Sequence, residues 1–160
     1  MDLNHFDNRG NAVMVDVSAK QPSMRVAVAE ASVRLSPELL EVILGGDMAK
    51  GDVFGVARLA GIMATKKTPE LIPLSHPLAI HSVEINFTSD KTKGFISVQC
   101  TVRAFERTGV EMEAMTGASV TALTIYDMCK GSDKSISIGE IKLLYKEGGK
   151  SGIYRREEAP

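Results

Sequence analysis

The stretch from Thr108 to Lys130 constrains the fold more than any other, because it is the longest helical pattern and contains no proline. Thr108 and Glu111 stand three residues apart, as in a capping box, so we expect the helix to begin at Thr108. Apolar side chains recur along it at helical spacing, at Met115, Ala118, Ala122, Ile125 and Cys129. This stripe predicts a helix that packs on a sheet.

The opposite side of the same helix is polar. It carries Glu113, Thr116, Thr124 and Asp127, and a polar helix side is ordinarily a solvated surface. Two observations favour a functional role instead. The side is rich in threonine and small residues, and Asp127 stands in the last turn, where the helix dipole disfavours a carboxylate. Lys130 is three residues further on and therefore a surface neighbour of Asp127.

The rest of the chain predicts strands and shorter helices in a definite order. Four stretches have strand patterns: 24–35, 80–88, 94–105 and 135–145. Ser36 and Asp52 are N-cap residues for two further helices, which end at Gly45-Gly46 and at Lys66-Lys67. Two prolines in 72–77 predict an irregular connection before the hairpin.

This order predicts an α+β fold of the ferredoxin-like, split βαβ type, with an extra helix in the first crossover. We expect a flexible N-terminal arm over residues 1–20 and a single domain over 21–160. The antiparallel sheet should carry its helices on one face. The hairpin also offers apolar residues in more than one phase, at Ile85, Phe87, Phe95, Val98, Cys100 and Val102. A second apolar sheet face would need cover, which predicts self-association.

The composition disfavours several classes of function. A net charge of −1 and 5% aromatic residues disfavour a nucleic-acid partner, and no apolar run has the length of a membrane span. The two cysteines lie in unrelated segments, and with three histidines no spacing resembles a metal site. We expect no metal, no cofactor and a reducing, cytoplasmic location, since the N-terminal residues are polar.

Lysines gather near glycine turns, at Lys50, Lys130, Lys134, Lys146 and Lys150. Such loops can surround phosphate oxygens with ammonium and amide groups, although any single loop lysine is more often simply solvated. The run Gly148–Ser151 is only half of a phosphate-loop motif. His76, held between Ser75 and Pro77, suits either a structural or a catalytic role.

The length of the long helix adds a geometric constraint. Met112-Glu113 and Asp127-Lys130 lie at its two ends, about 20 Å apart at 1.5 Å per residue. One small substrate cannot contact both ends of one helix. If both are functional, opposite helix ends from two subunits must meet, which favours a site at a subunit interface.

Seven stretches together resemble the MoaC family of molybdenum cofactor biosynthesis. They are residues 14–20, 50–54, 57–68, 71–78, 108–116, 122–130 and 148–152, in the order that the family has them. The resemblance implies a ferredoxin-like subunit in a homohexamer, a trimer of dimers with active sites at the dimer interfaces. It also implies a lyase reaction, in which a cyclised dihydro-GTP becomes a pyranopterin with a cyclic phosphate and diphosphate is released.

The resemblance also implies roles for individual residues. Asp127 would be the catalytic acid or base, with Lys50 and Lys130 in proton transfer or oxyanion stabilisation. The expected substrate-binding residues are Leu74, Ser75, His76, Met112, Glu113 and Lys146, with Arg25, Thr108 and Glu111 around them. Many relatives have cysteine where this chain has Ser75, which argues against an essential thiol.

The residue types suit this chemistry. Opening a purine ring and closing a pterin requires repeated proton transfers, which a carboxylate and a lysine can perform. Lys146, His76 and the helix N-terminus could stabilise departing diphosphate. The alternative is a non-catalytic oligomer that senses a nucleotide or pterin; only the enzyme requires Asp127 aligned with lysines. An Asp127→Asn variant should therefore bind ligand and lose turnover.

Overall fold

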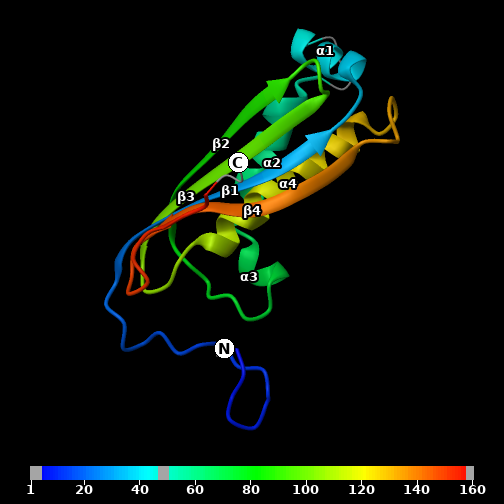
Figure 1. Ribbon diagram of the computed structural model, residues 1–160. Helices are drawn as coiled ribbons and strands as arrows, with labels where there is room; N and C mark the ends of the chain where they lie inside the picture. The colour runs from blue at the N-terminus through cyan, green and yellow to red at the C-terminus, as the bar shows by residue number, and fades with distance from the viewer. Residues whose placement is uncertain (1–4, 47–50, 158–160) are drawn as a thin grey trace.

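A computed structural model describes residues 5–46 and 51–157 of the chain. Its elements, in order, are β1 (Ser23–Arg34), α1 (Pro37–Gly45), α2 (Val53–Thr65), α3 (Thr68–Leu71), β2 (Ile80–Asp90), β3 (Phe95–Glu106), α4 (Glu111–Cys129), β4 (Ser137–Glu147) and β5 (Tyr154–Arg155). The sheet has the order β2-β3-β1-β4-β5 with all neighbours antiparallel. Figure 1 shows α2 and α4 on one face of it. The ferredoxin-like α+β prediction is confirmed, with α1, α2 and α3 in the first crossover.

The two predicted N-caps are confirmed in atomic detail. The Ser36 hydroxyl accepts a hydrogen bond from the Leu39 amide at 3.2 Å, and the Asp52 carboxylate accepts one from the Gly55 amide at 2.9 Å. Each satisfies an amide that the first helical turn leaves without a partner. Gly46 ends α1 with φ +78°, a left-handed conformation that glycine adopts without strain.

The predicted capping box of the long helix is wrong. α4 begins at Glu111, three residues after Thr108, and no side chain caps it. The Glu111 carboxylate instead accepts a hydrogen bond from Lys146 Nζ at 2.7 Å. Because Lys146 lies on β4, local spacing gave no sign of this competing partner.

α4 packs on the sheet and also against α2, which lies beside it on the same sheet face, so it is buried on two sides. The predicted stripe is confirmed at Ala118, Ala122, Ile125 and Cys129, which are all fully buried. The α2 side requires small residues: a Cβ on Gly117 would lie 2.7 Å from a Thr65 methyl group. On α4, this contact accounts for Gly117 and for the buried Thr121, whose hydroxyl group lies next to Gly61 of α2.

The hairpin offers apolar side chains in both phases, as predicted, but most of them face the helices. Ile85 is paired with Cys100 and Phe87 with Val98, so these residues share the helix-facing phase. Phe87 stacks on Phe54 of α2, with ring centroids 4.5 Å apart. Phe95 takes the other phase and lies under the Arg34 guanidinium.

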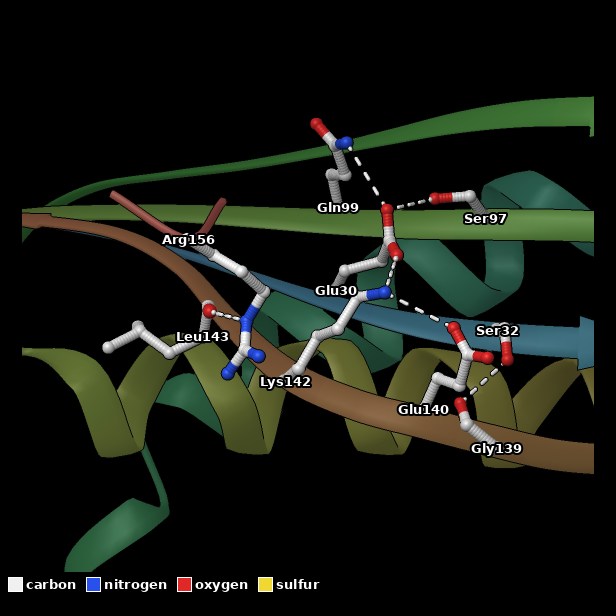
Figure 2. Close-up of polar contacts among 9 residues, drawn as sticks. All are labelled: Glu30, Ser32, Ser97, Gln99, Gly139, Glu140, Lys142, Leu143 and Arg156. Carbon is white, nitrogen blue, oxygen red and sulfur yellow. Dashed lines mark hydrogen bonds and ion pairs between the residues drawn. The ribbon is translucent and has the colours of Figure 1, made fainter. Parts of the chain in front are cut away.

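The sheet face away from the helices carries a network of paired polar groups, shown in Figure 2. The Glu30 carboxylate accepts a hydrogen bond from the Ser97 hydroxyl at 2.8 Å. Lys142 Nζ lies 3.4 Å from Glu30 and 3.1 Å from Glu140. These polar groups satisfy one another, so this part of the face needs no apolar cover. Elsewhere on the same face Met24 and Phe105 are paired and about half exposed, so self-association through this face stays a prediction.

The glycine-rich C-terminal segment forms more structure than expected. Gly148 and Gly149 turn the chain with φ of +104° and +74°, and β5 then pairs with the end of β4. At the other end, residues 5–22 cross below the α3–β2 connection without forming a helix or strand (Figure 1). Within the described ranges, no helix combines the length and the apolar character needed to cross a membrane.

Candidate active site

A pocket of about 800 Å³ lies beside the N-terminal end of α4. Three segments form its walls. The N-terminal segment contributes His5, Ala12, Val15, Val17 and Lys20. The connection between α3 and β2 contributes residues 72–76 and Leu78, and the entry to α4 contributes residues 108, 109 and 111–113.

Seven of the residues singled out from the sequence line this pocket: Leu74, Ser75, His76, Thr108, Glu111, Met112 and Glu113. They come from two segments more than 30 residues apart in the sequence. The folded chain thus brings them to one concave surface, the usual form of a small-molecule site. Their roles toward a substrate stay predictions.

Glu113 supplies the pocket with an acid that can titrate near neutral pH. Its side chain is buried, 3% exposed, although the sequence placed it on the polar side of the helix. Burial, assisted by the nearby charge of Glu111, raises the pKa of Glu113 to about 7. A carboxyl group with such a pKa can give and take protons at physiological pH.

His76 and Ser75 line the same pocket. His76 Nε2 lies 2.7 Å from the carbonyl oxygen of Val15, in the N-terminal segment. The Ser75 hydroxyl is buried and has no hydrogen-bond partner within the described protein. A buried polar atom without a partner is uncommon and is consistent with a site that a ligand completes.

Lys146 and Arg25 lie next to the pocket rather than in its lining. Lys146 is ion-paired with Glu111, and both side chains are only about one-quarter exposed. Arg25 is buried on β1 and donates from Nε to the Glu106 carbonyl at 3.0 Å and from Nη2 to the Arg107 carbonyl at 3.1 Å. Both of these carbonyls precede the turn into α4.

The turn at Gly148 and Gly149, which follows β4, packs against the side chain of Arg25. A Cβ on Gly149 would lie 1.9 Å from Arg25 Nη1, and a Cβ on Gly148 would lie 3.0 Å from Arg25 Cδ. Arg25 therefore holds the turn before α4 and the turn after Lys146 against each other. This arrangement positions the Lys146–Glu111 pair.

Asp127 and Lys130 lie at the far end of α4 and form an exposed ion pair with each other. A hydrogen bond from the ammonium group to Asp127, and the charge of Asp127, raise the pKa of Lys130. By helix geometry this pair is roughly 20 Å from Glu113, so one subunit does not bring the two groups together. The predicted catalytic Lys50 lies outside the described residues.

The described residues contain no cluster of three or more histidine, cysteine, aspartate or glutamate side chains arranged to hold a metal ion. Cys100 and Cys129 are buried and unbonded to each other, and burial raises the pKa of the Cys100 thiol to about 12. A thiol with so high a pKa is not a nucleophile at neutral pH. The ionisable side chains that line the pocket are His5, Lys20, His76, Glu111 and Glu113.

Comparison with known proteins relates this pocket to a family. The sequence model of the MoaC family matches residues 14–149. The chain belongs to the MoaC family. A protein of Pelobacter propionicus named cyclic pyranopterin monophosphate synthase is 75% identical over 158 residues, which cover 99% of both chains. Proteins of the same name from Geobacter sulfurreducens and Clostridium perfringens are 65% and 55% identical, over at least 95% of each chain.

Sequence reasoning missed the contribution of the N-terminal segment to the pocket of this MoaC protein. Val15 and Val17 are half-buried in it, whereas Met14, Asp16 and Ser18 between and beside them are exposed. In the sequence, residues 13–17 look like the one ordered piece of a polar N-terminal arm. Nothing in the sequence indicated that this piece would line the pocket.

Proposed function

We propose that this chain is a cyclic pyranopterin monophosphate synthase, as its relatives are named, and acts in molybdenum cofactor biosynthesis. The substrate would be cyclised dihydro-GTP, and the products cyclic pyranopterin monophosphate and diphosphate. Closing the cyclic phosphate breaks a phosphorus–oxygen bond without water, which makes the enzyme a lyase. The observation that carries the proposal is the convergence of the family-like stretches 14–20, 71–78 and 108–116 on one pocket.

Proton transfer is assigned to groups with the right environment. Glu113, with a pKa of about 7, can deliver a proton to the purine during ring opening and take one back during pterin closure. Asp127 and Lys130 remain the proposed acid–base pair, with Lys50 beside them. These three stay proposals that rest on the resemblance to the family.

Both helix ends can serve one substrate only if two subunits share the site. We therefore propose a homohexamer, a trimer of dimers, in which the Asp127–Lys130 end of one copy's α4 completes the Glu113 pocket of another. The length of α4 supports this, because the two groups are roughly 20 Å apart in one chain. A cytoplasmic location follows from a substrate made from GTP.

Diphosphate is the leaving group and needs positive charge where the bond breaks. Lys20 lines the pocket, and Lys146 stands beside it in a pair with Glu111. In this proposal Lys146 exchanges its contact with Glu111 for the phosphate oxygens when the substrate binds. Leu74 and Met112 provide apolar surface for the base.

The test supplies the purified protein with cyclised dihydro-GTP, without added metal, and follows diphosphate and pterin together. The proposal expects both products in equal amounts. Tight binding with neither product would instead indicate the nucleotide or pterin sensor. An Asp127→Asn variant that binds substrate and turns it over normally would refute the assignment of Asp127.

A further inference from the structure

The contact between His76 and the N-terminal segment restricts the chemistry of the imidazole. His76 Nε2 lies 2.7 Å from the Val15 carbonyl oxygen. A carbonyl oxygen can only accept a hydrogen bond, so Nε2 must carry the proton. In a neutral imidazole the other nitrogen, Nδ1, then has the lone pair and can only accept. A backbone group far from His76 in sequence thus selects its tautomer.

Neighbouring residues hold that backbone group in place. Val15 and Val17 are half-buried and line the pocket, whereas Val13 and Met14 are 41% and 48% exposed. The Lys20 amide donates to the Val17 carbonyl at 3.0 Å, which turns the chain toward β1. The two valines therefore hold the segment against the pocket, and this places the Val15 carbonyl oxygen next to His76.

We propose that residues 15–20 form a strap that fixes His76 as the Nε2–H tautomer, so that the imidazole serves the reaction as a proton or hydrogen-bond acceptor through Nδ1. Val15 and Val17 are then positioning residues, which act through His76. This inference rests on the proposed synthase function. It changes the role expected for His76, which is no longer a positively charged contact for the diphosphate group.

The chemistry of the pocket fits an acceptor at this position. Glu113, which lines the same pocket, is protonated in part of the molecules near neutral pH and can donate. A neutral His76 supplies the complementary acceptor. Ring opening and ring closure each need one group that gives a proton and one that takes it, and Glu113 and His76 provide one of each. The positive charge for phosphate is left to the lysines.

The direct test is the nitrogen NMR spectrum of the free full-length protein with labelled histidine. The His76 signals are assigned by their loss in a His76→Gln variant, which separates them from His5 and His81. The strap predicts a protonated Nε2 whose hydrogen exchanges slowly with water, together with an unprotonated Nδ1. A protonated Nδ1, a doubly protonated ring at neutral pH or a freely exchanging Nε2 hydrogen would overturn the inference.

A second experiment changes only Val15 and Val17, the two side chains that hold the strap against the pocket and that we call its seat. In a Val15→Asn/Val17→Asn variant the protected Nε2–H signal should disappear and kcat should fall about tenfold, because the ring then samples both tautomers and other orientations. The matched control, Val13→Asn/Met14→Asn, alters the same N-terminal segment at exposed positions that do not line the pocket. It should keep both the signal and kcat.

The two experiments separate this inference from the synthase proposal. If the unmodified protein releases no diphosphate from cyclised dihydro-GTP, the function fails while the NMR result still reports the tautomer. If the protein is active and the seat variant loses the Nε2–H signal without losing kcat, the strap does not position His76 for the reaction. Equal losses in the seat variant and its control would also contradict the inference.

Discussion

Glu113 carries a carboxyl group that folding moves from water into the wall of the pocket. Burial raises its pKa from 4.5 to about 7, with a smaller contribution from the charge of Glu111. Between these two values the folded chain holds a proton that the unfolded chain has released. Stability therefore falls as the pH rises from about 4.5 to about 7, and above that range the loss is complete.

A Glu113→Gln variant should be more stable than the native chain at about pH 8, by up to about 3 kcal/mol. The amide resembles the protonated carboxyl group and stays neutral, so the advantage should vanish near pH 4. Urea unfolding at both pH values measures the difference. Glu41→Gln, at an exposed position on α1, is the control and should change little at either pH. A gain that is equal at both pH values would contradict the raised pKa.

Two serines differ in whether their buried hydroxyl groups have a partner. Ser75 Oγ has none in the described protein, whereas Ser32 Oγ donates to the Gly139 carbonyl at 2.7 Å. Ser75→Ala should therefore raise the unfolding free energy by about 1 kcal/mol and Ser32→Ala should lower it by about 1 kcal/mol. Thermal unfolding of the ligand-free variants compares them. Opposite signs are the essential result, and a loss in both would mean that Ser75 has a partner.

At the scale of the elements, Arg25 joins the turn before α4 to the turn after β4. Gly149→Ala should destabilise the chain, because the new Cβ meets a guanidinium that two carbonyl groups hold in place. Gly152→Ala is the matched control: its φ is also positive, at +65°, but no atom lies within 4 Å of the added Cβ. We expect about 1 kcal/mol for the control, from backbone strain, and a distinctly larger loss for Gly149→Ala.

The synthase rate tests the same clamp separately. Displacing Arg25 moves Lys146 relative to Glu111, so Gly149→Ala should lower kcat while Gly152→Ala leaves it nearly unchanged. Two variants with equal stability and equal rates would show that the glycine turn is not held by Arg25. The comparison needs no assumption about the size of the backbone strain, since both glycines carry it.

The elements that the sequence predicted correctly are those whose signals are local. Ser36 and Asp52 cap helices through amides three residues away, and the α4 stripe follows from helical spacing alone. The capping box failed because Glu111 has a stronger partner, Lys146, that local spacing does not show. The share of hairpin residues that face the helices was not visible locally either, because it depends on cross-strand pairing such as that of Ile85 with Cys100.

The residues of the candidate site were likewise predictable only where the sequence carried a clear signal for them. The pocket-lining residues at 74–76 and 108–113 were singled out by their resemblance to the family, and the fold brings them together. The partly buried Val15 and Val17 were overlooked, because an alternating pair of valines in a polar segment is a weak signal without the wall that it covers. The raised pKa of Glu113 was also hidden, since it depends mainly on burial in the folded chain.

At the scale of the whole molecule, the distance between the two ends of α4 determines how the proposed active site must be assembled. Glu113 stands at one end in a pocket, and Asp127 stands at the other end in an exposed ion pair. A rigid helix keeps them roughly 20 Å apart. If both residues serve one reaction, each active site must take Glu113 from one subunit and Asp127 from another.

Mixing two inactive variants tests this directly. Glu113→Gln and Asp127→Asn are each expected to lose activity, and co-refolding equal amounts pairs them at random. A mixed dimer then has one site with both substitutions and one site with neither, so about one quarter of the native activity should return. If each site used one chain alone, the mixture would be no more active than the separate variants.

The complementary mixture places both substitutions in one chain and combines it with the native chain. With shared sites, every mixed dimer is inactive, because each of its sites receives one altered residue, and activity falls to about one quarter. With sites made from single chains, the native subunit of each mixed dimer would keep working and about one half would remain. The two mixtures therefore move in opposite directions under the shared-site proposal, and a general defect in assembly cannot imitate both results.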